Sequence, residues 1–218
     1  MRGKKYWEIG GFLAGAVLIL FGAVAIFMGI SGYRTVHDEL NQQYIVGSSD
    51  MTPAAIKSEA QQAKLSSDVA LPTCDVAGQT IDNGSKARCF AQYMRIHTLE
   101  STGGLTYAQM GRYQSAAKPA DQAGTNDAKA AAKDATGQPI ANAARNIWVT
   151  ETALTTALNT SYMADQLALF GIVTGVAFVL TGFGFAILAI GGALRSREHA
   201  FGWFHGSEQA PVQPVPTT

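Results

Sequence analysis

The chain has 218 residues, of which 47% are hydrophobic, and its 16 Lys and Arg residues balance its 16 Asp and Glu residues. This even charge argues against a nucleic-acid-binding protein, which needs a basic surface patch. Two stretches, 9–32 and 167–194, contain no Asp, Glu, Lys, Arg or His. Each is longer than the roughly 20 apolar residues with which a helix crosses a bilayer. We therefore predict an all-α membrane protein with two spans.

Small residues recur in both stretches at alternating steps of four and three, which places them on one face of each helix. Lipid provides no hydrophobic drive for helix association, so close approach of the backbones has to supply the contact. We expect an antiparallel transmembrane hairpin, with Gly32 level with Gly171 and Gly22 level with Gly182. The alternative is that one face binds a separate membrane subunit. The glycines assigned to helix packing are Gly11, Gly15, Gly22, Gly29, Gly171, Gly175 and Gly182.

Basic residues flank the spans on one side, and cytoplasmic flanks are enriched in Lys and Arg. Arg2, Lys4 and Lys5 precede the first span, and Arg195 and Arg197 follow the second. We therefore predict a multi-pass plasma-membrane protein with both termini in the cytoplasm. The predicted parts are a cytoplasmic N-terminus (1–8), a first span (9–32), an extracytoplasmic helical domain (33–164), a second span (165–194) and a disordered cytoplasmic tail (195–218).

The first span is interpreted as an uncleaved anchor. Its apolar run exceeds the roughly 7–15 residues of a signal-peptide core. The alternative is a signal peptide cleaved near Gly29 and Ser31, which form a weak small-residue site.

Local signals predict three helices in the first part of the central domain. Thr52-Pro53 is a typical helix start, and this helix is expected to end near Ser66. A second helix is expected from Ser85 to the stop at Gly103-Gly104. The spacing of Thr106 and Gln109 fits a capping box and predicts a short third helix.

The rest of the central domain is less regular. Residues 115–137 are rich in Ala, Lys and Asp, and we predict a surface excursion that is partly helical or mobile. We expect a new helix to begin at Pro139. The run 159–161, Asn-Thr-Ser, is interpreted as a cap at which the membrane helix begins anew, with Asp165 near its positive end.

Cys74 and Cys89 are the only cysteines, and both lie in the part that we expect to be exported, where disulfides persist. A bridge between them would close a loop of about 15 residues and contribute about 3 kcal/mol in the chain-entropy model. We predict a structural disulfide. Free thiols and redox chemistry are the alternatives, although the Cys-x-x-Cys spacing of redox sites is absent.

His97 and Glu100 are one helical turn apart, but a metal site needs further ligands. His37 is expected near the membrane, and His199 and His205 lie in the predicted cytoplasmic tail. No Gly-x-Ser-x-Gly or phosphate-loop motif is present either. We therefore predict no metal, no cofactor and no catalytic residues.

The segment 97–107 reads His-Thr-Leu-Glu-Ser-Thr-Gly-Gly-Leu-Thr-Tyr. It resembles uncharacterised two-span membrane proteins of actinobacteria, whose hallmark is a His-x-Leu-Glu-x-Thr-Gly-Gly-x-Thr-Tyr segment between the spans. The resemblance covers both spans and this motif, and it implies an actinobacterial plasma membrane without assigning an activity. Some members carry the label of aromatic ring-opening dioxygenase, which we do not transfer because the exported part offers no triad of two histidines and a carboxylate. The motif residues whose role is open are His97, Glu100, Gly103, Gly104 and Tyr107.

The resulting functional hypothesis is a non-enzymatic component of the cell envelope that contacts lipid and either a membrane-protein partner or further copies of itself. The alternative is an extracytoplasmic sensor or lipid-binding module that signals to the tail. Phe201, Trp203 and Phe204 in that tail are interpreted as an interfacial anchor, with a partner motif as the alternative.

Overall fold

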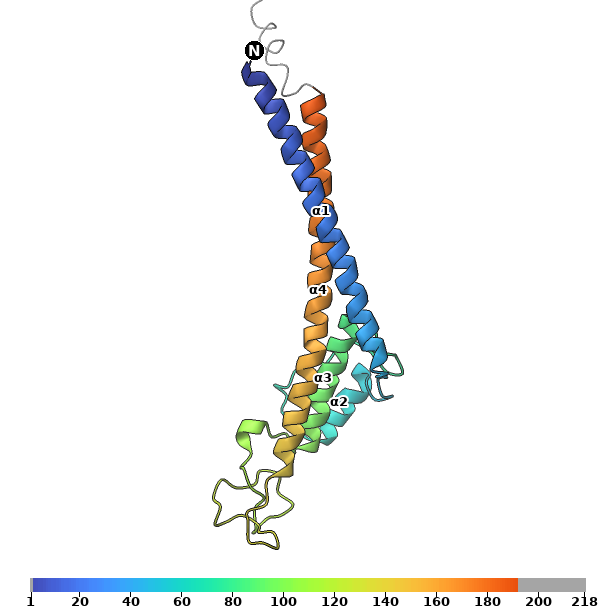
Figure 1. The fold of residues 1–218 in the computed structure, drawn as a ribbon. Helices are drawn as coiled ribbons and strands as arrows, with labels where there is room; N and C mark the ends of the chain where they lie inside the picture. Colours follow the sequence, from blue (N-terminus) through green and yellow to red (C-terminus); the bar gives the residue numbers. More distant parts are fainter. Residues whose placement is uncertain (1, 192–218) are drawn as a thin grey trace, which may run out of the picture. The chain divides into compact units, whose positions relative to one another are not determined.

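The computed structural model describes residues 2–191, and their side chains from Ile9 onward. Within this range the secondary structure is helical, with isolated β-bridges and no strands, as predicted. The predicted tail and residues 192–194 of the second span lie outside the described residues. The elements in chain order (Figure 1) are α1 (Arg2–Gln42), α2 (Pro53–Gln62), α3 (Gly84–Ser101), the 3-10 helix η1 (Tyr107–Gln109) and α4 (Ala143–Ile190).

The chain divides into two compact units. Unit 1 contains the described residues up to Met28 and from Gly171 onward, and unit 2 contains Gly29–Phe170. The helices α1 and α4 contribute residues to both units, and each is long and apolar enough to cross a membrane.

In unit 1, α1 and α4 are antiparallel and touch through glycines. A Cβ atom placed on Gly22 would lie 2.5 Å from the carbonyl oxygen of Gly175, and one on Gly15 would lie 2.7 Å from that of Gly182. Contacts this short exclude any side chain larger than hydrogen without movement of the backbone. The contact through glycine is as expected, but the predicted register is wrong, because Gly22 faces Gly175 rather than Gly182.

Two isoleucines of α1 pack beside glycines of α4 in the observed register, Ile26 beside Gly175 and Ile19 beside Gly182. Phe178 and Phe185 are 40% and 41% exposed, and Phe185 Cβ lies 3.5 Å from the Cβ position of Gly15. The backbones therefore approach closely enough for the small residues to pack.

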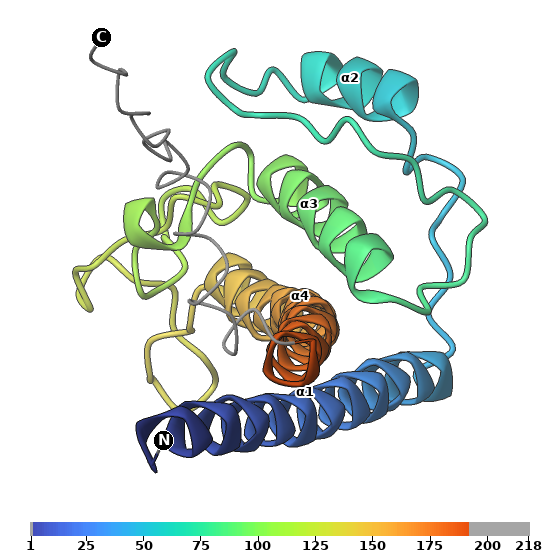
Figure 2. The same ribbon diagram turned by 90° about the horizontal axis from the view of Figure 1, so that it is seen from above.

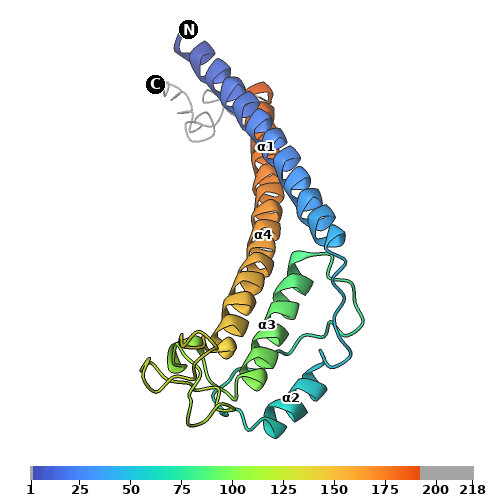
Figure 3. The same cartoon turned by 60° about the horizontal axis from the view of Figure 1, so that its bottom comes forward.

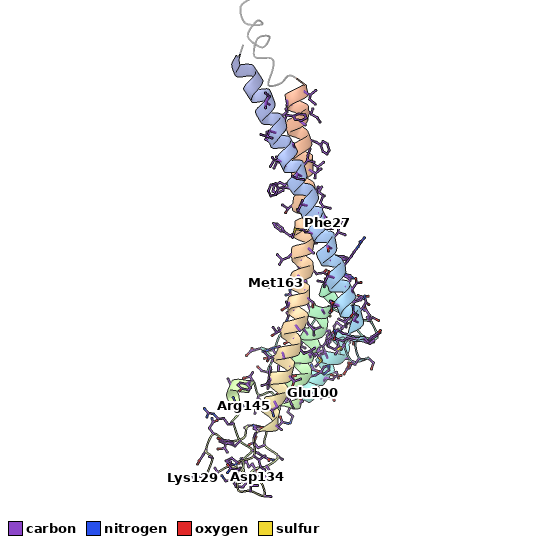
Figure 4. The ribbon with its side chains drawn as sticks, in the orientation of Figure 1. Phe27, Glu100, Lys129, Asp134, Arg145 and Met163 are labelled. Carbon is purple, nitrogen blue, oxygen red and sulfur yellow. A yellow bond between two sulfur atoms is a disulfide. The ribbon has the colours of Figure 1, made fainter. Side chains whose placement is uncertain are left out.

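The outward faces of unit 1 are apolar. Phe27, which is labelled in Figure 4, is 74% exposed. Ile187 is 67% exposed. Water-soluble proteins rarely leave contiguous apolar surface of this kind uncovered. The surface of unit 1 is therefore chemically suited to lipid.

Unit 2 is built around α3, which lies between α2 and the first half of α4 (Figures 2 and 3). Tyr93 and Ile96 of α3 are almost completely buried, as are Ile56 of α2 and the loop residues Val76 and Ile81. This apolar packing fixes the positions of α2 and α3, which carry the candidate functional residues.

The helix ends follow the predicted local signals closely. The Thr52 hydroxyl accepts a hydrogen bond from the Ala55 amide at the start of α2, and Asn83 caps α3 through the amide of Lys86. The glycines after α3 adopt positive φ angles, 63° at Gly103 and 79° at Gly104, which only glycine adopts without strain. The helix α2 is shorter than predicted and ends at Gln62.

The predicted break at 159–161 is wrong, because α4 is continuous from Ala143 to Ile190. The Thr160 and Ser161 hydroxyls donate to the carbonyl oxygens of Thr156 and Ala157, one turn earlier in the same helix. These residue types cap a helix only where they leave the helical conformation, and a hydroxyl bonded to the preceding turn is compatible with a helix that continues.

Residues 111–142 form turns and isolated bridges rather than a helix. Tyr113 forms bridges with Thr125 and Ala141. The Asn142 side-chain amide donates to the carbonyl oxygens of Gly111 and Gln122, at 3.1 and 2.9 Å. Of the two alternatives predicted for the surface excursion 115–137, the helical one is not found, because polar side chains hold this segment in turns.

Candidate functional site

The motif at 97–107 spans the last turn of α3, the glycine turn and η1. Its second half is structural. The Thr102 hydroxyl is buried and lies 2.8 Å from the carbonyl oxygens of both Thr98 and Leu105. The Trp148 indole of α4 donates to the Leu105 carbonyl at 2.9 Å. Together these bonds fasten the end of α3 to α4.

Tyr107 closes the motif, and the Arg145 guanidinium of α4 lies 3.9 Å from the centre of its ring. The predicted capping box is present, since the Gln109 side chain accepts from the Thr106 amide at 2.8 Å. Gly103, Gly104 and Tyr107 thus shape the turn and its contact with α4.

The first half of the motif contributes to a polar cluster that the sequence did not reveal. His97 lies among three carboxylates. Its Nε2 atom is 3.7 Å from Asp50 Oδ2, and its Nδ1 atom is 3.7 Å from Glu59 Oε2 and 3.8 Å from Glu100 Oε2. Figure 4 labels Glu100 on this part of α3. We call these four residues the His97 cluster.

Three segments of the chain position the His97 cluster. Asp50 is in the loop before α2, where its backbone carbonyl accepts from the Thr52 amide and its other carboxylate oxygen accepts from Ser48. Glu59 lies on α2, and His97 and Glu100 occupy one face of α3, a turn apart. The packing of α2 on α3 therefore brings the four side chains together.

The electrostatics of the His97 cluster are unfavourable to the charged form of Glu59. Burial, the Asp50 carboxylate and Glu100 raise the pKa of Glu59 above its usual value, and the nearby His97 only partly opposes this. Ligand atoms of Asp50, Glu59 and His97 lie within 4.8 Å of one another, a separation that permits them to share one metal ion.

The expected disulfide between Cys74 and Cys89 is present. It ties the loop before α3 to the first turns of that helix. Beside it, the Tyr93 hydroxyl donates to the Cys74 carbonyl at 2.6 Å. Tyr93 thus belongs to the core, and burial raises the pKa of its phenol.

A second polar group of unit 2 includes Asp165 of α4. Its Oδ2 atom accepts from the Gly84 amide at 3.1 Å, at the start of α3. Its Oδ1 atom is 3.8 Å from His37 Nε2 of α1, and Tyr33 stacks on the His37 ring at a centroid distance of 4.2 Å. Asp165 was expected to favour the start of a membrane helix, and the structure shows that it binds the start of α3 instead.

The seven packing glycines differ in burial. Gly15, Gly22, Gly29, Gly175 and Gly182 are buried, whereas Gly11 and Gly171 are half-buried. The structure thus assigns five of the seven to closely packed positions.

Sequence reasoning missed Asp50 and Glu59. They precede His97 by 47 and 38 residues, and no local spacing connects them to it. The other histidines considered as ligands are elsewhere, since His37 belongs to the Asp165 group and His199 and His205 lie outside the described residues. Comparisons of the chain with protein-family models, curated proteins and solved structures find no match.

Proposed function

We propose that the chain is a non-enzymatic integral membrane protein of the cell envelope that serves as an accessory subunit of a membrane assembly. Its two spans form an antiparallel hairpin in the plasma membrane. The apolar exterior of unit 1 and the glycine contacts between α1 and α4 support this placement. The central domain is extracytoplasmic and both termini are cytoplasmic, in keeping with the basic residues outside the spans and with a disulfide in the central domain.

The observation that carries the accessory role is an apolar groove in unit 2. It has a volume of about 500 Å³. Two of its lining residues are well exposed, Val149 at 56% and Tyr107 at 45%. An apolar surface of this kind outside the spans is suited to a protein partner. The groove is lined by Tyr107, Trp148, Val149, Thr152, Ala153 and Thr156.

Purification in a gentle detergent, followed by mass spectrometry, tests the accessory role. We expect a partner in stoichiometric amount with the wild-type chain. Val149→Lys should release it, because burial of an unpaired ammonium group in the interface is costly. Thr136→Lys, at an exposed position of the 111–142 segment, is the control and should retain it. A solitary wild-type monomer, or a partner retained by Val149→Lys, would contradict the proposal.

The orientation is tested separately with a cysteine at the exposed position of Ala120. An impermeant maleimide should label Ala120→Cys on intact cells. Labelling that appears only after the cells are broken would overturn the extracytoplasmic assignment.

The second candidate function is an extracytoplasmic sensor that signals to the tail. The observation in its favour is the Asp165 group, in which α1, α3 and α4 meet through His37, Gly84 and Asp165. A displacement of α3 therefore acts on both α1 and α4 through these polar contacts. Deletion of residues 201–218 separates the two hypotheses, since it abolishes signalling by a sensor but leaves assembly by an accessory subunit intact.

A further inference from the structure

We propose that the His97 cluster binds one divalent first-row transition-metal ion, of the class represented by Zn²⁺ and Mn²⁺. The ligands are the imidazole of His97 and the carboxylates of Asp50, Glu59 and Glu100.

The distances between the His97 nitrogens and the carboxylate oxygens are too long for hydrogen bonds and match the separations between ligand atoms of one metal ion. The three nitrogen–oxygen separations are 3.7, 3.7 and 3.8 Å. Hydrogen bonds between imidazole and carboxylate close to about 2.7–2.9 Å. Ligand atoms that are each about 2.0–2.2 Å from one ion lie about 3–4 Å apart. One ion binds one nitrogen of a ring, and single ligand atoms of Asp50, Glu59 and His97 lie within 4.8 Å of one another. A single ion therefore fits among these three groups after side-chain adjustments, with Glu100 beside them.

The His97 ring has no other partner that accounts for its position. Its Nε2 atom is buried and makes no hydrogen bond to the described residues, although it faces Asp50. Burial of a polar nitrogen without a partner is unfavourable. Coordination of a metal ion would satisfy either ring nitrogen, and the two positive charges of the ion would offset two of the three negative charges of the carboxylates.

The composition of the ligand set selects the class of ion. Ca²⁺ and Mg²⁺ prefer oxygen ligands alone. Imidazole is a ligand of zinc, iron, nickel and copper, and carboxylates also suit manganese. One imidazole with up to three carboxylates therefore favours a transition ion with mixed nitrogen and oxygen ligands over an alkaline-earth ion.

Metal binding would have a structural consequence for unit 2. The ligands come from the loop before α2, from α2 and from α3, which are otherwise joined mainly by apolar packing. An ion would fasten α2 to α3 on the side of α3 that carries His97. The inference is independent of the accessory role, because an ion binds the purified chain whether or not a partner protein exists.

The test uses the full-length chain in detergent, prepared without a polyhistidine tag and stripped with EDTA. Calorimetric titration with Zn²⁺ and with Mn²⁺ should show one ion per chain for at least one of the two, and a raised unfolding temperature with that ion. His97→Gln and Glu59→Gln should each weaken binding at least about tenfold. Glu39→Gln, which alters an exposed carboxylate of α1 outside the cluster, is the matched control and should bind as the wild type does.

Measurements in EDTA keep the test informative if a variant is damaged. Glu59→Gln removes one of the mutually repelling carboxylates, so in EDTA it should unfold at the same temperature as the wild type or at a higher one. Binding of neither Zn²⁺ nor Mn²⁺, binding of Ca²⁺ or Mg²⁺ alone, or binding that His97→Gln leaves unchanged would each overturn the inference.

Discussion

Replacement of Gly175 by alanine should separate the two long helices in unit 1. The new Cβ atom would lie 2.7 Å from the Gly22 carbonyl oxygen and 2.7 Å from Ile26 Cγ1. Ordinary Cβ contacts begin at 3.4 Å, so the backbones would have to move apart by about 0.7 Å. Overpacking of this size costs about 1–3 kcal/mol. The same replacement at Gly184, whose Cβ position has no atom within 4 Å, provides the control.

The assay is SDS titration in mixed micelles, with energy transfer between dyes on cysteines at the exposed positions of Leu13 and Ile187. Separated spans remain helical in detergent, so helix propensity contributes little to the measured difference. We expect Gly175→Ala to lower the free energy of separation by about 1–3 kcal/mol. Gly184→Ala should change it by less than about 0.5 kcal/mol. Equal effects of the two variants would refute the assigned contact.

Two further predictions concern unit 2. Asp165→Ala removes the carboxylate that accepts a hydrogen bond from the first turn of α3. We expect the free energy of unfolding to fall by about 1–3 kcal/mol and deuterium exchange at amides 84–87 to become faster. Unchanged exchange at these amides would count against this role of Asp165. A hydrogen bond from Lys86 lowers the pKa of Asp82 below its usual 3.8. The ionised Asp82 therefore stabilises the fold at neutral pH. This stabilisation is lost as the pH falls from about 4 through the lower pKa of the folded state. Asp82→Asn should therefore reduce the loss of stability between pH 7 and pH 3 in unfolding titrations, by under about 1 kcal/mol because the pair is partly exposed. An unchanged acid dependence would rule this contribution out.

Features encoded by a few adjacent residues could be predicted from the sequence. The start of α2 follows from Thr52, whose side chain accepts from the amide three residues ahead. Asn83 caps α3 in the same way, although the sequence predicts only that this helix begins near Ser85. The turn after α3 follows from Gly103 and Gly104, and the capping box from Thr106 and its glutamine partner. In each case the chemistry that fixes the backbone is contained within one turn of chain.

Features that depend on distant residues could not be predicted in the same way. The break expected at 159–161 failed because a hydroxyl that can cap a helix can also bond to the preceding turn, and only the surrounding packing decides between them. The register of α1 on α4 depends on the packing of Ile19 and Ile26 beside glycines of the other helix. The carboxylates around His97 are assembled by the packing of α2 on α3, which no spacing in the sequence records.

The bond between Gly84 and Asp165 joins groups that are 81 residues apart in the chain. During synthesis, α3 leaves the ribosome long before the aspartate that binds its first turn, and before Trp148 and Leu158, which complete the same core. The central portion therefore cannot finish folding until about the first half of α4 has been made. A fragment intended for expression without the membrane segments has to extend at least to Asp165. A fragment that stops near residue 142 would expose to solvent the face of α3 that packs against α4.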